Sequence, residues 1–365
     1  MDHPLNVTGY EIYQYRLPLR QPFMVFNQPV AFREGLIIRL LTAEGFCGVG
    51  EAAPLPGLSE ETFKKTIFQL KNLRARLLNF PIPSDVKEYQ KTFSKEPWIN
   101  HCASVRFAIE MAALHLMSQI NKQVPAEFLK CPPISNVLVA GLLQGTPDEI
   151  KSQANRLLNE GFNVFKLKIG SRNIPLDVKK VQLVRELIGS TRKLRLDANQ
   201  AWSMVEAVAF CQNAGLEGIE FIEEPLKETS GLEQFICQTG CPVALDESIQ
   251  KQDPEKFIFP DGVKFIVVKP TIVGGIVKTF QWIARALKEK KGVVISSVFE
   301  SGVAGRMLAN LASFSPLAAG LGTQEWLAQD LLEPLHKKDS NFILRASLQF
   351  SWEDIDTRQL TAISF

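Results

Sequence analysis

The segment VFKLKIG, residues 164–170, places two lysines two positions apart in a run that otherwise has the composition of a buried strand. Because side chains alternate between the two faces of a strand, Lys166 and Lys168 share one face, and Phe165, Leu167 and Ile169 share the other. The apolar face can pack on helices, whereas the lysine face needs a solvated, paired or reactive environment. A solvated strand face is the simpler interpretation, so the rest of the chain has to decide between them.

Seven further apolar runs follow the same rhythm, and stretches with a helical pattern separate them. The eight runs cover residues 135–143, 163–170, 193–200, 218–225, 242–248, 264–270, 292–300 and 317–322. Strands that alternate with helices form parallel sheets, and eight of them predict an α/β fold of the TIM-like (β/α)8 barrel type. Since the last unit is short, we expect a distorted barrel of the (β/α)7β form.

The first 132 residues have a different pattern, in which strands precede helices. Strand-like segments at 7–19 and 33–57 are followed by amphipathic helical segments at 59–78 and 102–120. This order predicts a separate α+β domain. We therefore expect an α+β domain at 1–132, a catalytic barrel at 133–322 and a C-terminal segment at 323–365 that returns to the first domain, with CPPIS (131–135) as the boundary.

Composition excludes several classes of protein. The 365 residues contain 41 Lys and Arg against 39 Asp and Glu, and this balance gives no basis for binding nucleic acid or an anionic membrane. The sequence has neither an apolar run of about 20 residues nor the pattern of a signal peptide. Six scattered cysteines predict free thiols in a reducing compartment. We expect a cytoplasmic protein with a small-molecule partner, and its oligomeric state stays open, a monomer included.

Chemical groups lie at the C-terminal ends of five consecutive predicted barrel strands. In chain order these groups are Lys166 and Lys168, then Asp197, Glu223, Asp246 and Lys269. Because the C-terminal ends of barrel strands build the active site, we expect all six residues in one place. Any one of them alone is more often a solvated or salt-bridged residue, but their joint spacing favours catalysis.

The three carboxylates predict a metal site. Asp197, Glu223 and Asp246 come from neighbouring strands about 4.8 Å apart. Carboxylates this close repel one another unless a cation lies among them. Oxygen ligands without His or Cys indicate a hard ion, Mg²⁺ before Mn²⁺.

The lysines predict a proton-transfer pair. In a ring of eight strands, Lys168 and Lys269 lie four strands apart and would face each other across a metal-held ligand. Lys166 and Lys168 would each disfavour protonation of the other, and so would the nearby ion. A lysine whose pKa is lowered in this way is a usable general base, and we assign that role to Lys168.

Two alternative functions, a dinucleotide-binding enzyme and a non-catalytic binding protein, fit the sequence less well. GVGEAAPLPG (48–57) offers the G-x-G of a dinucleotide-binding loop, but the third glycine and the acidic residue about 20 positions later are missing. A non-catalytic binding protein of the same fold is disfavoured, because a degenerate site has no reason to keep all these lysines and carboxylates.

At these residues the sequence resembles the enolase superfamily, in particular its muconate-lactonizing subgroup. The matching motifs are KLK (166–168), LDAN (196–199), IEEP (222–225), LDES (245–248) and VVKP (267–270). A finer resemblance, to the o-succinylbenzoate synthases, lies in GVGEAAPLPGLSEET (48–62) and SSVFESG (296–302). It implies that the first domain caps the barrel, that the 54–62 loop closes the barrel mouth, and that Glu224 lies behind the metal ligands.

The resemblance also implies a reaction: Mg²⁺-dependent syn dehydration of 2-succinyl-6-hydroxy-2,4-cyclohexadiene-1-carboxylate to o-succinylbenzoate, in menaquinone or phylloquinone biosynthesis. Lys168 would remove the proton alpha to the ring carboxylate and then protonate the leaving hydroxyl. Lys269, as a cation, would stabilise the enediolate together with the ion. Lys166 would contact the substrate carboxylate.

Several residues are expected to contact the substrate, and related reactions stay open. The candidate contacts are Arg195, Asn199, Ser297, Ser301 and Gly302. Filling of the barrel interior is an equal alternative for Arg195. N-succinylamino acid racemases and dipeptide epimerases belong to the same subgroup. The D-x-D pair that usually marks the epimerases is missing from the corresponding stretches, 297–308 and 320–332, which argues against an aminoacyl substrate.

Overall fold

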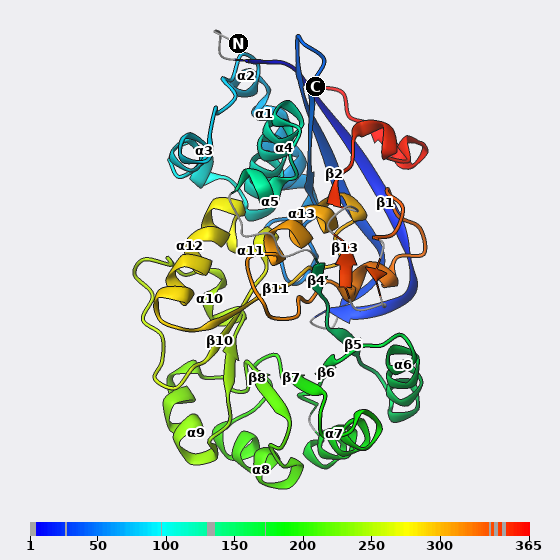
Figure 1. Ribbon diagram of the computed structural model, residues 1–365, viewed down its shortest axis with the longest axis vertical. Helices are drawn as coiled ribbons and strands as arrows, with labels where there is room; N and C mark the ends of the chain where they lie inside the picture. Colours follow the sequence, from blue (N-terminus) through cyan, green and yellow to red (C-terminus); the bar gives the residue numbers. More distant parts are fainter. Residues whose placement is uncertain are drawn as a thin grey trace.

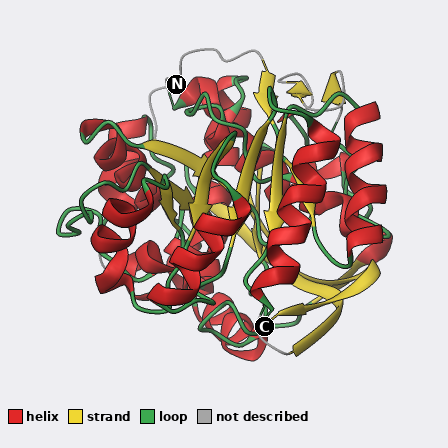
Figure 2. Ribbon diagram, turned by 90° about the horizontal axis from the view of Figure 1, so that it is seen from below, coloured by secondary structure: helices red, strands yellow, loops and turns green. Residues whose placement is uncertain are grey.

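The computed structural model describes residues 5–25, 28–95, 97–129, 136–171, 173–335, 337–338, 342–344 and 348–365. Figure 1 shows an antiparallel sheet with helices at one end of the molecule and a curved parallel sheet with outer helices at the other. Figure 2, seen from below, shows helices gathered around the strands.

The antiparallel sheet joins the two ends of the chain. Its strand order is β14-β1-β2-β3, and its strands are β1 (Val7–Val25), β2 (Gln28–Thr42), β3 (Cys47–Ala52) and β14 (Leu360–Ala362). The last strand pairs with the first, with Ala362 opposite Tyr13. The C-terminal end therefore lies on the sheet that the N-terminal residues form. The domain boundaries stay a prediction, and 131–135 falls outside the described residues.

Five helices accompany this sheet: α1 (Phe63–Asn72), α2 (Arg74–Leu77), α3 (Val86–Phe93), α4 (Ala103–Asn121) and α5 (Pro125–Phe128). Helix α4 is buried along most of its length and packs directly on β3. The approach is close because β3 presents glycines to the helix. A Cβ atom at Gly50 would lie 1.9 Å from the carbonyl oxygen of Ala108, and one at Gly48 would lie 2.2 Å from that of Ala112.

The second part is a seven-stranded parallel sheet in the order β11-β10-β9-β8-β7-β6-β5. Its strands are β5 (Gly141–Leu143), β6 (Val164–Lys168), β7 (Lys193–Asp197), β8 (Ile219–Glu223), β9 (Val243–Leu245), β10 (Phe265–Val268) and β11 (Gly292–Ile295). The helices between and after them are α6 (Pro147–Asn159), α7 (Ile174–Ile188), α8 (Met204–Ala214), α9 (Leu232–Thr239), α10 (Glu247–Gln250), α11 (Pro270–Val273), α12 (Ile276–Lys288) and α13 (Gly302–Ala312).

The ring of strands closes through a short extended segment. Ala319 forms a parallel bridge to Val139, and Gly320 forms one to Ser296, so residues 319–320 link the two edges of the sheet. The expected distorted (β/α)7β barrel is confirmed, and the short last unit, 317–322, contributes only these single bridges.

The first predicted barrel run, 135–143, is divided between two sheets. Strand β4 (Asn136–Leu138) pairs with β13 (Phe342–Leu344), which in turn pairs with β12 (Lys337–Lys338). Only β5, after a break at residues 139–140, joins the barrel sheet.

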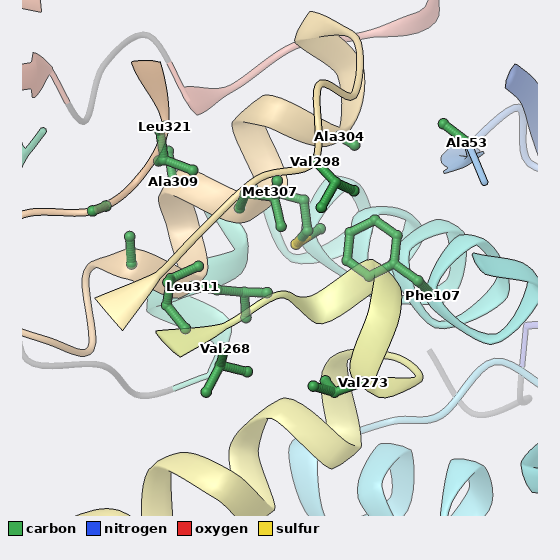
Figure 3. Packing of buried hydrophobic residues seen from close by; sticks show 14 of the residues in the cluster. Ala53, Phe107, Val268, Val273, Val298, Ala304, Met307, Ala309, Leu311 and Leu321 are labelled. Atoms are coloured by element: carbon green, nitrogen blue, oxygen red, sulfur yellow. The ribbon is translucent and has the colours of Figure 1, made fainter. Parts of the chain in front are cut away.

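One hydrophobic core serves both parts of the molecule. Figure 3 shows Phe107 of α4 beside Val298 of the barrel, with Ala304 and Met307 of α13 nearby, and all four belong to a single buried cluster. We call the antiparallel sheet and its helices the capping region. Because separating it from the barrel would expose this cluster, we expect the two parts to unfold together.

Two expectations from composition can be compared with the described residues. The cysteines found there, Cys47, Cys102, Cys211, Cys237 and Cys241, all have free thiols, and Cys131 lies outside these ranges. No helix in the described part of the chain combines the length and the apolar character needed to cross a membrane.

Replacing Gly50 with Ala should destabilise the protein strongly, because the new methyl group would overlap the backbone of α4 at Ala108. We expect a loss of about 3 kcal/mol in the free energy of unfolding, measured by chemical denaturation. Gly45→Ala is the matched control: its φ of 89° strains an alanine, but nothing lies within 4 Å of the added atom, so a loss of only about 1 kcal/mol is expected. Equal losses in the two variants would contradict the close packing of β3 on α4.

Candidate active site

The C-terminal ends of the barrel strands open into a cavity of about 730 Å³. Barrel residues at the strand ends line its floor, among them Lys166, Lys168, Asp197, Glu223 and Lys269. The capping region contributes to the lining as well, from two separate segments of chain: Gln21, Pro22, Phe23, Val25, Leu55 and Leu58. The 54–62 loop therefore does reach the mouth of the barrel.

The register of the parallel strands arranges the charged side chains in layers. Lys168 on β6 is paired with Asp197 on β7, which is paired with Glu223 on β8. The layer below contains Lys166, Arg195 and Phe221, also in register. The alternation of the two faces, which predicted this grouping from the sequence, holds in the structure.

Lys166 and Lys269 form the closest ion pairs with the three carboxylates. The Nζ atom of Lys166 lies 2.8 Å from Oδ2 of Asp197 and 2.8 Å from each carboxylate oxygen of Glu223. Lys269 donates a hydrogen bond to Oδ2 of Asp246. All three carboxylates are 1% exposed or less, so these charges interact with little screening by water.

The surroundings of Lys166 differ from the expectation. We expected the neighbouring Lys168 to disfavour the charged form of Lys166. Burial does act to lower the pKa of Lys166, but Asp197 and Glu223 outweigh burial and raise it above its ordinary value. Lys166 is therefore a fixed positive charge, and the expectation is wrong because the two carboxylates in direct contact with Lys166 outweigh both burial and the nearby positive charge of Lys269.

Lys168 has a looser environment. Its Nζ atom lies 3.5 Å from Oδ2 of Asp197, and its side chain is 42% exposed. It donates a hydrogen bond of 3.1 Å to Oδ1 of Asn199. The Asn199 amide in turn donates to Oε1 of Glu247 at 3.0 Å. The chain Glu247–Asn199–Lys168 thus orients the amine of Lys168 at the cavity, and Asn199, expected to contact substrate, has this partner inside the protein.

Glu247 is a site residue that sequence reasoning missed. It lines the cavity, its Oε2 atom is buried without a hydrogen-bond partner, and burial, followed by the charge of Asp246, raises its pKa to about 7. The only available signal was its position directly after Asp246 in LDES, where it was passed over in favour of the aspartate.

Glu224 holds three strand ends together from behind the site. Its Oε1 atom accepts hydrogen bonds from the backbone N–H groups of Asp246 and Ser248, at 2.8 and 2.7 Å. Its Oε2 atom accepts from the Ser248 hydroxyl and from the Gln200 amide. The Glu224 backbone has a φ of 43°, in the left-handed region. Glu224 therefore fixes the loops after β7, β8 and β9 relative to one another.

The donor set fits a hard divalent cation in its chemistry. Asp197, Glu223 and Asp246 supply only oxygen ligands. Burial first, and then the charge of Asp197, raises the pKa of Glu223 well above the usual range, so added positive charge at this point would be stabilising. As they stand, the His, Cys, Asp and Glu side chains of the described residues form no group of three spaced to hold a metal ion. The ammonium groups of Lys166 and Lys269 occupy the carboxylate oxygens instead.

Arg195 lies deep in the barrel, and its contacts are compatible with both predicted roles, filling of the barrel interior and contact with the substrate. Its Nε atom pairs with Glu220 at 2.5 Å, its Nη1 atom donates to the carbonyl oxygen of Ala318, and its guanidinium lies over the ring of Phe221. These contacts fill the barrel interior. However, Arg195 also lines the cavity, and its Nη2 atom is buried without a partner.

Of the three residues after β11 that were expected to contact the substrate, the structure places only Ser297 in the cavity lining. Ser297 lines the cavity, where its hydroxyl donates to the carbonyl oxygen of Gly320 at 3.1 Å and hydrogen-bonds with Thr323. Ser301 is 0% exposed, Gly302 is buried, and neither belongs to the cavity lining. The physical reason is that α13 begins at Gly302, so these residues bind acceptors outside the cavity: Ser301 donates to Glu51 and Gly302 to Asp330. The expectation that Ser301 and Gly302 contact substrate is corrected accordingly.

An aromatic group at the mouth was also missed. Phe23, Phe299 and Trp326 line the cavity together, although they come from β1, from the loop after β11 and from the 3₁₀ helix η3 (Gly322–Trp326). No period or motif in the sequence connects three residues so far apart, so no sequence signal pointed to them.

Comparison with known families agrees with this geometry. A family model described as enolase C-terminal domain-like matches residues 149–343, and one described as the MenC N-terminal domain matches residues 7–116. The o-succinylbenzoate synthase of Aliivibrio salmonicida is 30% identical over 348 residues, which cover 94% of this chain and 98% of that protein.

Solved structures with the same fold include two relatives of lower identity. The muconate lactonizing enzyme of Pseudomonas fluorescens superimposes with a TM-score of 0.86 at 21% identity, covering 98% of both chains. A dipeptide epimerase of Enterococcus faecalis, solved with Mg and a dipeptide, gives a TM-score of 0.83 at 22% identity, covering 94% of this chain and 97% of the other. At these identities the two structures establish the fold alone.

Replacing Glu224 with Ala should loosen the site and lower stability, because four hydrogen-bond donors would lose their acceptor. We expect a loss of about 3 kcal/mol in the free energy of unfolding, measured by chemical denaturation. Glu228→Ala, at an exposed position four residues further along, is the control and should change stability by less than about 0.5 kcal/mol. If Glu224→Ala were as stable as the control, the strand ends would not depend on this carboxylate.

Proposed function

The chain belongs to the o-succinylbenzoate synthase family of the enolase superfamily, and we propose that it catalyses the family's reaction. In that reaction 2-succinyl-6-hydroxy-2,4-cyclohexadiene-1-carboxylate loses water, by syn elimination, to give o-succinylbenzoate for menaquinone or phylloquinone biosynthesis. We further propose that the enzyme acts in the cytoplasm on this small carboxylate substrate.

The order of the strands is the observation that carries the proposal. In the sheet, β10 with Lys269 and β6 with Lys168 lie on either side of β9, β8 and β7. The strands between them bring the carboxylates Asp246, Glu223 and Asp197 to the same face. A ligand held at the carboxylates therefore lies between two amines, which is the arrangement that abstraction of a proton beside a carboxylate requires.

Asp197, Glu223 and Asp246 are the residues that would hold Mg²⁺, with Mn²⁺ as a substitute. When bound, the ion supplies positive charge beside the ring carboxylate of the substrate, where negative charge develops during the reaction. The Mg in the structure of the dipeptide epimerase supports this choice of metal.

The protein's own residues then have separate roles. Lys168, oriented by Asn199, takes the proton alpha to the ring carboxylate, and the same ammonium then donates a proton to the leaving hydroxyl group. Lys269 is buried beside Asp246 and Glu247, and although burial opposes it, these carboxylates raise its pKa above the ordinary value. Lys269 is therefore a permanent cation that can stabilise the enediolate. Lys166 is a second fixed positive charge, placed beside Asp197 and Glu223, where it would contact the substrate carboxylate.

Activity should depend on the metal. We expect purified protein to convert the cyclohexadiene substrate to o-succinylbenzoate, followed by ultraviolet absorbance as the aromatic ring forms. EDTA should abolish this turnover, and Mg²⁺ or Mn²⁺ should restore it. Full activity in metal-stripped protein would contradict the metal assignment. Racemisation of an N-succinylamino acid or epimerisation of a dipeptide, without formation of o-succinylbenzoate, would contradict the proposed reaction.

Substitutions of Lys168 and of Lys269 should affect turnover in different ways. Lys168→Ala and Lys168→Arg should both lose at least about 10²–10⁴-fold in kcat, because arginine cannot act as a base at neutral pH. Lys269→Arg keeps a cation and should retain partial activity. Lys179→Ala, at an exposed position on α7, is the control and should match the wild-type rate. Near wild-type dehydration by Lys168→Ala together with an inactive Lys269→Ala would reverse the roles given to the two lysines.

A further inference from the structure

Arg33 is a buried cation that connects the capping sheet to the barrel. It lies on β2, is 1% exposed and is not among the residues that line the cavity. Its guanidinium donates to three carbonyl oxygens: those of Ala53 at 2.8 Å, Pro54 at 3.3 Å and Phe299 at 2.9 Å. The first two belong to the capping loop at the mouth, and the third belongs to the barrel loop after β11.

The residue on the barrel side, Phe299, has an unusual backbone. Its φ of 64° lies in the left-handed region, which is uncommon for a residue with a bulky side chain and persists only where the surroundings enforce it. The neighbours on either side of Phe299 are fixed as well. Glu300 accepts a hydrogen bond from the Val298 N–H at 2.6 Å, and the Ser301 N–H donates to Glu51 at 2.9 Å. The Arg33 bond to the Phe299 carbonyl is the contact that acts on the strained residue itself.

This backbone conformation determines where the ring of Phe299 lies. The ring stacks on that of Phe23, with centroids 4.2 Å apart and planes inclined by 22°. Trp326 meets both rings edge-on, at 6.0 Å from Phe23 and 6.1 Å from Phe299. The three rings line the cavity from three separate segments of chain. We call them the aromatic wall.

Tyr15 and Glu51 form a second buried connection between the capping sheet and the barrel. Tyr15 donates to Glu51 at 2.6 Å, and Glu51 also accepts the Ala304 N–H at the start of α13. The Tyr15 hydroxyl can reach Glu51 only because residue 35 is glycine, since a Cβ atom there would lie 2.2 Å from the hydroxyl oxygen. Burial and then the charge of Glu51 raise the pKa of Tyr15 well above its usual value, so it stays a neutral donor. A buried carboxylate and a buried guanidinium therefore both join the capping sheet to the segment 299–304.

We propose that Arg33 is a positioning residue that holds Phe299 in its left-handed conformation, so that the aromatic wall contacts the non-reacting acyl chain of the substrate. Arg33 itself touches neither substrate nor metal ligands. The identity of the substrate rests on the proposed function, whereas the hold of Arg33 on Phe299 does not.

The test compares two arginines of the same strand. Arg33→Gln removes the three-way donor, whereas Arg39→Gln removes an arginine that pairs with Glu11 at 2.7 Å and lies over the ring of Trp352, outside the cavity lining. We expect Arg33→Gln to raise KM roughly tenfold with kcat within roughly threefold of wild type, because the lost contacts are apolar ones away from the reacting atoms. Arg39→Gln should leave both constants unchanged, even if it lowers stability.

A double-mutant cycle tests whether Arg33 acts through Phe299. Phe299→Gly keeps the left-handed backbone, which glycine adopts freely, but removes the ring. It should raise KM as much as Arg33→Gln, and the double variant should be no worse than either single one. Multiplied losses in the double variant, an unchanged KM, or a fall in kcat alone would overturn the proposal.

Two further measurements separate this proposal from the proposed function. By calorimetry, both variants should bind o-succinylbenzoate more weakly than wild type does. They should bind benzoate as tightly as wild type does, because benzoate lacks the acyl chain. Equal weakening for both ligands would overturn the proposal.

A crystal structure of Arg33→Gln, or of Arg33→Lys should the first variant fail to fold, should show Phe299 outside the left-handed region and its ring no longer stacked on Phe23. Phe299 unmoved in that crystal would overturn the proposal, whereas an inactive wild-type enzyme would count only against the proposed function.

Discussion

The ammonium group of Lys166, between the carboxylates of Asp197 and Glu223, is the interaction on which the rest of the site depends. Closing a ring of parallel strands brings their C-terminal ends to one face, and in this chain it brings three carboxylates together where little water reaches. Taking such charges out of water costs several kcal/mol for each ion unless partners compensate. Lys166 and Lys269 supply that compensation from the two sides of the carboxylate strands. The two lysines to which the proposed function gives the role of fixed charges therefore also stabilise the strand ends of the fold.

A second constraint couples the capping region to the barrel through helix termini. Glu51 of β3 accepts backbone N–H groups at the start of α13, and Glu110 of α4 accepts the N–H of Val277, at the start of α12, at 2.8 Å. Burial raises the pKa of Glu110 to about 7, although Arg106 opposes this. Gly275 lets Glu110 approach, since a Cβ atom there would lie 2.6 Å from both of its carboxylate oxygens. Because N-terminal N–H groups of a helix need acceptors, α12, whose N-cap Gly275 has no capping side chain, obtains an acceptor from the capping region. Helix α13 has its own cap in Ser301, and Glu51 supplies further acceptors there.

The sequence was informative where a single strand determines the direction of a side chain, and uninformative where distant segments meet. Alternation along VFKLKIG and KLRLD correctly predicted that Lys166, Lys168 and Asp197 share a face, because strand geometry alone fixes that direction. The charge state of Lys166 was misjudged, since it depends on how close Glu223 on β8 lies. Ser301 and Gly302 were misplaced because their acceptors, Glu51 and Asp330, lie 250 and 28 residues away in the chain. The positive φ of Phe299 left no trace in the sequence, because phenylalanine is not one of the residue types, such as glycine, asparagine and aspartate, that commonly adopt this conformation.

These two kinds of constraint divide the work of the enzyme between two sets of residues. In the proposed function, proton transfer depends on amines and carboxylates at the ends of β6–β10, so changing any of them would also disturb the charge balance of the barrel. The mouth is built from Phe23 and Leu55 of the capping region and from Phe299 and Trp326 of the barrel, which carry no charge and take no part in that balance. In the proposed function, substitutions at the mouth would therefore change substrate binding and leave the proton chemistry intact.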